Sequence, residues 1–184
     1  MRYIPVIFDD EPVMPAKASR VRKWIKSGKA TPYWNHGVFC VRLNKEPSGF
    51  EMQSVACGID PGSKKEGFTV KSRTKTYINI QADAVTWVKK RIELRHLLRR
   101  GRRHRKCPHR KQRRRIGTKL PPSTKARWQL KLRILNWLIA IYPITDVAVE
   151  DIKAVSWKGA KRWNMSFSPL QVGKKWFYNK IASF

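Results

Sequence analysis

The stretch that decides the fold is Val55-Ala56-Cys57-Gly58-Ile59-Asp60-Pro61-Gly62-Ser63. Its first six residues are mostly apolar and end in a carboxylate, and the Pro-Gly pair that follows is typical of a tight turn. We therefore predict a short buried strand with Asp60 at its carboxyl end. Two further short strands, 67–70 and 76–80, are predicted to follow it in a meander.

A second apolar run ends in the same way. Residues 144–150, Ile-Thr-Asp-Val-Ala-Val-Glu, predict another buried strand, after a helix that begins at Ser123 or Thr124 and ends before Pro143. If the two strands are neighbours in one sheet, Asp60 and Glu150 meet at one edge and can hold hard divalent cations, Mg²⁺ or Mn²⁺. A pair of such ions supports phosphodiester hydrolysis. The alternative is structural, because Asp-Pro-Gly is an ordinary turn and Glu150 can serve as a cap.

The charge of the chain points to a polyanionic partner. Its 184 residues include 41 Lys and Arg against 12 Asp and Glu, a net charge of +29. Residues 89–115 contain 15 basic residues among 27 and one acid, Glu93. The spacing predicts a helix over 82–98 that directs arginines toward phosphates, and the alternative is a solvated charge run. The candidate nucleic-acid-binding residues are Arg91, Arg95, Arg99, Arg100, Arg102, Arg103, Arg105, Arg110, Arg113, Arg114 and Arg115.

The N-terminal residues predict a small unit of their own. It consists of a strand at 3–8, a turn at 9–12, a helix at 19–27 that ends at Gly28, and a strand at 38–43. Residues 45–49 are predicted to form a linker. No apolar run of about 18 residues and no signal sequence occurs, so we predict no membrane segment. Three scattered cysteines are typical of a protein of the reducing cytoplasm.

Four motifs, in order, resemble those of the IscB and IsrB families of transposon-associated, RNA-guided nucleases. Residues 58–63 and 147–150 resemble the first and second motifs of RuvC-type, RNase H-like nucleases. Residues 97–105 resemble the arginine-rich bridge helix of the RNA-guided members. Pro12-Val13-Met14-Pro15 is similar to the PLMP unit of these families, with Val13 where they have Leu.

The resemblance implies an α/β fold: an RNase H-like (RuvC) mixed sheet, split and incomplete, with a small N-terminal α+β PLMP unit and a long bridge helix. It divides the chain into a PLMP-like unit and linker (1–49), a first RuvC part (50–81), the bridge helix with a basic extension (82–120) and a second RuvC part (121–184). It also implies that Asp60 and Glu150 are catalytic metal ligands.

The same resemblance implies a nickase of the bacterial or archaeal cytoplasm. One protein would bind one guide RNA of the omega-RNA type and cut the displaced strand of the target DNA. In such proteins base pairing reads the sequence, whereas the protein reads the backbone of the RNA–DNA hybrid.

The sequence departs from the family pattern after Glu150. No His or Cys follows, so we expect no HNH nuclease domain and assign the chain to the IsrB-like branch. The third RuvC motif, a helix bearing His and Asp, is not found there either. We expect the N-terminal part of a longer nuclease or a truncated relative that binds RNA without efficient cutting. A non-catalytic RNA-binding module and an unguided junction resolvase are the alternatives.

Overall fold

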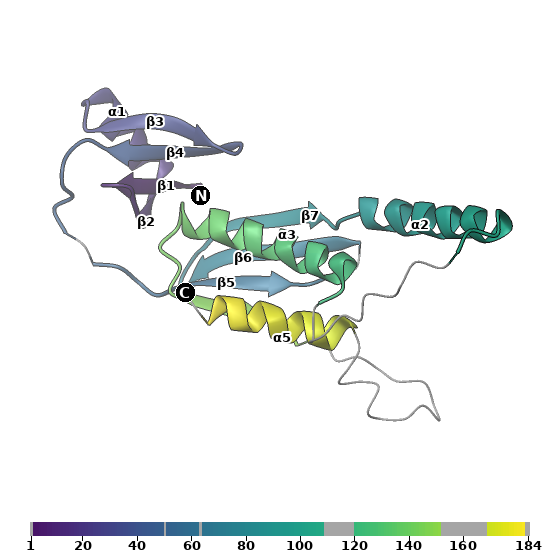
Figure 1. Cartoon of the computed structure of the whole chain (residues 1–184). Helices are drawn as coiled ribbons and strands as arrows, with labels where there is room; N and C mark the ends of the chain where they lie inside the picture. Colours follow the sequence, from purple (N-terminus) through teal and green to yellow (C-terminus); the bar gives the residue numbers. More distant parts are fainter. Residues whose placement is uncertain (1, 50, 63, 109–119, 152–168, 183–184) are drawn as a thin grey trace. The chain divides into compact units, whose positions relative to one another are not determined.

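The computed structural model describes residues 2–49, 51–62, 64–108, 120–151 and 169–182. Within these residues the protein has a mixed α/β architecture with two four-stranded mixed sheets and four helices (Figure 1). The chain divides into two compact units, the first made of Met1–Asp83 and Lys131–Ile152, the second of Ala84–Leu130 and Lys153–Phe184. Among the helices described, none is both long enough and apolar enough to cross a membrane.

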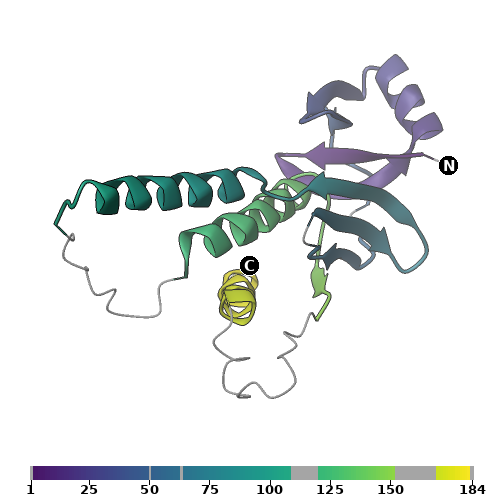
Figure 2. The ribbon, with the colours of Figure 1, turned by 90° about the vertical axis from the view of Figure 1, so that its right-hand side faces the viewer.

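The first sheet, in the first unit, has the strand order β2-β1-β4-β3. Its strands are β1 (Tyr3–Phe8), β2 (Glu11–Lys17), β3 (Ala30–Asn35) and β4 (Val38–Leu43). Strand β1 pairs antiparallel with β2 and parallel with β4, and β3 pairs antiparallel with β4. Helix α1 (Ala18–Lys26) packs on this sheet (Figure 2). The core between helix and sheet consists of Val6, Ala16, Val21, Ala30 and Val41.

Two strands of this sheet, β2 and β3, differ from the sequence-based prediction, which placed a turn at 9–12 and no strand at either position. Asp9 and Asp10 both adopt positive φ, 49° and 63°, so the chain reverses within two residues and the strand resumes at Glu11. Both strands contain proline, which lowers strand propensity. Prolines are tolerated here because β2 and β3 are the edge strands of the sheet.

The second sheet, also in the first unit, has the strand order β7-β6-β5-β8. Strands β5 (Val55–Asp60), β6 (Lys65–Ser72) and β7 (Thr76–Asp83) form an antiparallel meander, and β8 (Asp146–Val149) adds parallel to β5. The predicted meander is confirmed, with β6 and β7 longer than the pattern indicates. Alternate residues of β5 and β6 are buried, as expected for a sheet with one covered face. They include Val55, Cys57, Ile59, Phe68 and Val70.

Helix α3 (Pro122–Ile139) precedes β8, where the sequence predicts a helix, and from Lys131 onward it belongs to the first unit. This part lies along the second sheet (Figure 1) and buries Leu135 and Leu138 completely. Lys131 Nζ donates a hydrogen bond to Glu66 Oε1 of β6 at 2.6 Å, and the two side chains are only 5% and 1% exposed. The helix is therefore held to the sheet by apolar packing and by one buried ion pair.

The second unit contains α2 (Trp87–His104), the first half of α3 and α5 (Pro169–Ile181). The Trp128 and Phe177 rings lie 5.1 Å apart between α3 and α5, and both residues are buried. A Cβ at Gly173 would collide with the Trp128 indole, so glycine permits the close approach of the two helices. Trp128 and Phe177 therefore belong to the core of the second unit.

Candidate functional site

The structure brings Asp60 and Glu150 together at the ends of two neighbouring parallel strands. In the β5–β8 ladder Ile59 is the partner of Val149, and the Glu150 backbone N–H donates to the Ile59 carbonyl at 3.0 Å. Asp60 and Glu150 are therefore the next pair in the register. Because side chains alternate along a strand, both leave the sheet on the face opposite the buried Ile59. Both residues are exposed to solvent.

The two carboxyl groups interact directly. A hydrogen bond with Asp60 is the main cause that raises the pKa of Glu150 above its ordinary value, and the negative charge of Asp60 adds to the effect. Two like charges in contact disfavour the doubly ionised state, and a cation between them reverses that preference. This is the electrostatic situation of a metal-binding carboxylate pair, although structural pairs show the same shift.

A glycine that the sequence analysis missed leaves room beside this pair. Gly67 is the partner of Asp60 across the β5–β6 ladder. A Cβ at this position would lie 3.4 Å from Asp60 Cβ and 3.8 Å from Asp60 Oδ2. A side chain at this position would therefore occupy the space in van der Waals contact with the Asp60 carboxyl group, which glycine leaves open. The signal in the sequence is a glycine inside a strand, which often marks a close approach of other groups.

The donor set fits a hard divalent cation in part. Mg²⁺ prefers oxygen ligands, keeps several waters, and is often held by one or two carboxylates together with substrate phosphates. Asp60 and Glu150 would supply these carboxylates. Within the described residues no group of three or more His, Cys, Asp and Glu side chains gathers at one point, so this part of the chain offers no third ligand of these types.

The described arginines of the cationic stretch lie on or next to α2. The helix carries Arg91, Arg95, Arg99, Arg100, Arg102 and Arg103, and Arg105 is its C-cap residue. Arg91, Arg95 and Arg99 recur every fourth residue and so share one face. Arg91 lies over the Trp87 ring, 4.6 Å from its centroid. In the part of α2 and its cap that the structure describes, none of these arginines forms an ion pair.

Helix α2 differs in its bounds from the predicted helix over 82–98, and most of its apolar side chains are not buried. The helix begins at Trp87, because β7 continues to Asp83, and Val88 is its buried residue. The described side chains of Ile92, Leu94, Leu97 and Leu98 are 41–60% exposed. Along most of its length α2 therefore presents both its arginines and its leucines to solvent. The predicted site residues Arg110, Arg113, Arg114 and Arg115 lie outside the described residues.

Comparison with known proteins yields one family. The family model described as RRXRR protein matches residues 4–158. Residues 99–103 of α2 read Arg-Arg-Gly-Arg-Arg, the pattern that this name spells. The match also includes both sheets, Asp60 and Glu150. No curated protein matches the chain.

Proposed function

The chain belongs to the RRXRR protein family, and on this premise we propose that it is a guide-RNA-binding, RNA-guided DNA nickase of the IscB and IsrB type. The family name is one associated with nucleases of that type. The proposal treats the second sheet as an RNase H-like RuvC sheet. A three-stranded antiparallel meander, with a fourth strand parallel to its first, supports this interpretation.

The observation that carries the proposal is the meeting of Asp60 and Glu150 at the end of β5 and β8. In the proposed reaction these two carboxylates bind Mg²⁺ or Mn²⁺, and Gly67 keeps the space beside Asp60 open. A divalent cation bound there would neutralise the negative charge that develops on the scissile phosphate of the displaced DNA strand.

The arginines of α2 have the role of the bridge helix in this proposal. Guanidinium groups on one helical face contact successive phosphates of the guide RNA, because their planar donors match phosphate oxygens. Base pairing between guide RNA and target DNA then selects the sequence. We propose one chain per guide RNA of the omega-RNA type.

The test is cleavage by the chain together with the RNA that co-purifies with it when it is expressed with its flanking genomic sequence. Sequencing that RNA identifies the guide and hence the matching DNA duplex. We expect Mg²⁺-dependent nicking of one strand, and a loss of about a hundredfold or more in Asp60→Asn and Glu150→Gln. Asp83→Asn is the matched control, because Asp83 is an exposed acid on β7 of the same sheet.

Filter binding of the same RNA separates catalysis from assembly. The two site variants should bind it as tightly as the parent chain does. Cleavage that persists in Asp60→Asn would contradict the assignment of the site, and equal losses in Asp83→Asn would show a general effect of charge.

A second candidate function is a non-catalytic RNA-binding module. The observation that favours it is the incomplete ligand set, since the described residues bring only two carboxylates together at this point. This candidate predicts tight RNA binding and no cutting with Mg²⁺ or Mn²⁺.

A further inference from the structure

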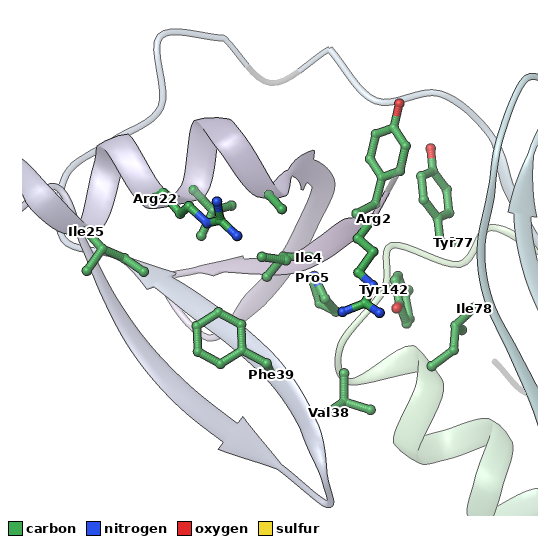
Figure 3. A pocket seen from close by; sticks show the side chains of 13 residues that line it. Arg2, Ile4, Pro5, Arg22, Ile25, Val38, Phe39, Tyr77, Ile78 and Tyr142 are labelled. Carbon is green, nitrogen blue, oxygen red and sulfur yellow. The ribbon is translucent and has the colours of Figure 1, made fainter.

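A cavity of about 550 Å³ lies in the first unit, away from the carboxylate pair. Its walls come from the start of β1, from α1, β4 and β7, and from Tyr142 just after α3 (Figure 3). Its volume is within the range of about 300–1,000 Å³ that ligand pockets have. The Tyr3 and Tyr77 rings join β1 to β7, meeting edge to face at 5.5 Å. Beside the cavity, Trp137 Nε1 of α3 donates to Asn35 Oδ1 of β3 at 3.1 Å.

Aromatic rings make up much of the wall. Tyr3, Phe39, Tyr77 and Tyr142 all line the cavity, and the Tyr77 and Tyr142 rings are stacked with an interplanar angle of 21°. Ile4, Ile25 and Ile78 add aliphatic surface. A flat, sequence-tolerant surface of this kind is what a nucleobase needs, because every base has a π-face that stacks on aromatic rings.

The charge of the cavity is entirely positive. Arg2 and Arg22 line it, and none of the lining residues is acidic. Figure 3 shows Arg22 on the α1 side, Tyr77 and Ile78 on the opposite side, and Arg2 between them. Within the described residues neither arginine forms an ion pair. Two unpaired guanidinium groups beside aromatic rings fit a ligand that joins an aromatic base to a phosphate.

The residues around the cavity favour a nucleic-acid strand over a free nucleotide as its ligand. Helix α1 contains no acidic residue, and its exposed Arg20, Lys23 and Lys26 continue the positive charge beyond the cavity. A free nucleotide would not reach these basic residues, whereas a nucleic-acid strand would place its neighbouring phosphates beside them. The net charge of +29 indicates a polyanion in the same way.

We propose that this cavity holds one unstacked nucleotide of a bound RNA strand, with the base against the aromatic rings and its phosphates at Arg2 and Arg22. The identity of the strand as RNA rests on the proposed function. The cavity itself does not depend on the carboxylate pair or on cleavage.

The experiment is photo-crosslinking of the full chain to a short single-stranded RNA of mixed sequence that contains 5-iodouridine, with the crosslinked residues mapped by mass spectrometry. We expect crosslinks at Tyr3, Phe39 or Tyr77. Their yield should fall about tenfold in the double variant Arg2→Ala/Arg22→Ala, because both phosphate contacts are lost. The matched control is Arg73→Ala/Lys75→Ala, which removes the same charge from exposed positions between β6 and β7 that do not line the cavity, and it should change the yield less than about twofold.

A second pair of variants tests the stacking surface by RNA affinity. Phe39→Leu keeps apolar volume but removes a ring from the wall, and we expect the affinity to fall severalfold. Trp34→Leu is its control, because the Trp34 ring contacts Phe39 but does not line the cavity. Thermal melting of each variant verifies that the fold is retained.

Several results would overturn the proposal. They are crosslinks that map only outside the cavity, equal losses in the two double variants, and labelling of the cavity by 5-iodouridine monophosphate but not by RNA. Stronger labelling by single-stranded DNA of the same sequence would refute the choice of RNA. Cleavage, measured with the same protein preparations in the presence of the co-purifying RNA and its matching duplex, keeps the two proposals apart. Crosslinks without cleavage contradict only the nickase, and cleavage without crosslinks contradicts only the cavity.

Discussion

Asp60 and Glu150 define the chemistry at the scale of single residues. Each is an acidic residue at the end of a strand, and each is exposed to solvent. What distinguishes them is their mutual contact, which raises the pKa of Glu150 through the hydrogen bond with Asp60 and through like charge. Protonation of Glu150 is thus easier in the folded state than in a free glutamate side chain, and a bound cation would oppose this.

The first prediction concerns this pKa. In Asp60→Ala we expect the pKa of Glu150 to return toward its ordinary value, because both causes of the shift are removed. A folded-state pKa that is raised contributes stability below the unfolded pKa, and this contribution is lost as pH rises through the folded pKa. At pH values above the folded-state pKa, Glu150 is ionised and its repulsion with Asp60 is greatest. Mg²⁺ should therefore bind the parent chain more tightly there than at lower pH.

Carbon-13 NMR titration of the glutamate carboxyl groups provides the measurement, with Asp83→Ala as the control. A Glu150 titration that is the same in the parent chain and in Asp60→Ala would show that the two carboxyl groups do not interact in solution.

At the scale of elements, α2 differs from the other described helices. Helices α1, α3 and α5 each bury an apolar residue against a neighbouring element, whereas α2 buries Val88 and leaves Leu97 and Leu98 60% exposed. Packing against neighbouring elements therefore contributes little to the stability of this helix. Its arginines instead give it a cationic surface without compensating acids other than Glu93, which suits phosphate binding.

The second prediction tests that surface by salt dependence. Replacing Arg99 and Arg103, one turn apart on α2, with alanine should reduce the slope of log K against log [salt] for RNA by about 1.4 to 1.8, at roughly 0.7 per single-strand phosphate or 0.9 per duplex phosphate. The measurement is filter binding across a salt series.

The control for α2 is Arg73→Ala/Lys75→Ala. These two residues are exposed between β6 and β7, so this variant removes the same charge from a different element. If both double variants reduced the slope equally, RNA binding would depend on the total charge of the molecule and not on α2.

At the scale of the whole molecule, the Glu66–Lys131 pair connects segments that are distant in the sequence. It joins β6 to the part of α3 that leads into β8, and so helps to fix the sheet that carries both carboxylates. Removing water from two charges is costly, and a single partner left behind would be a buried, uncompensated charge. Removing one partner should therefore destabilise the fold much more than removing both.

The third prediction follows from this burial. Lys131→Met should lower the free energy of unfolding by about 3–5 kcal/mol, whereas Glu66→Leu/Lys131→Met should recover most of that loss. The exposed pair Asp10–Arg42, 2.9 Å apart, is the control, and Arg42→Ala should cost less than about 1 kcal/mol. Urea denaturation measures all three, and a small loss in Lys131→Met would mean that water reaches Glu66.

The local sequence pattern was enough to predict those elements whose own residues show strand or helix periodicity. Strand β5 and the residues of β8 are apolar runs that end in an acid, and α1 has helical spacing before Gly28. Strands β2 and β3 were missed because they are edge strands with prolines, which only their neighbours make acceptable. The aromatic cavity was missed because its walls come from elements far apart in the chain.

The sequence by itself determined the chemistry that this protein can use, its carboxylates at strand ends and its arginines at helical spacing, because residue type and short-range periodicity establish donors and charge. Only the tertiary structure decided that Asp60 lies beside Glu150 and that Gly67 leaves room for them, since strand pairing between distant segments sets the register. It also decided that the leucines of α2 are exposed and that Glu66 and Lys131 are buried, because burial depends on what packs against each side chain.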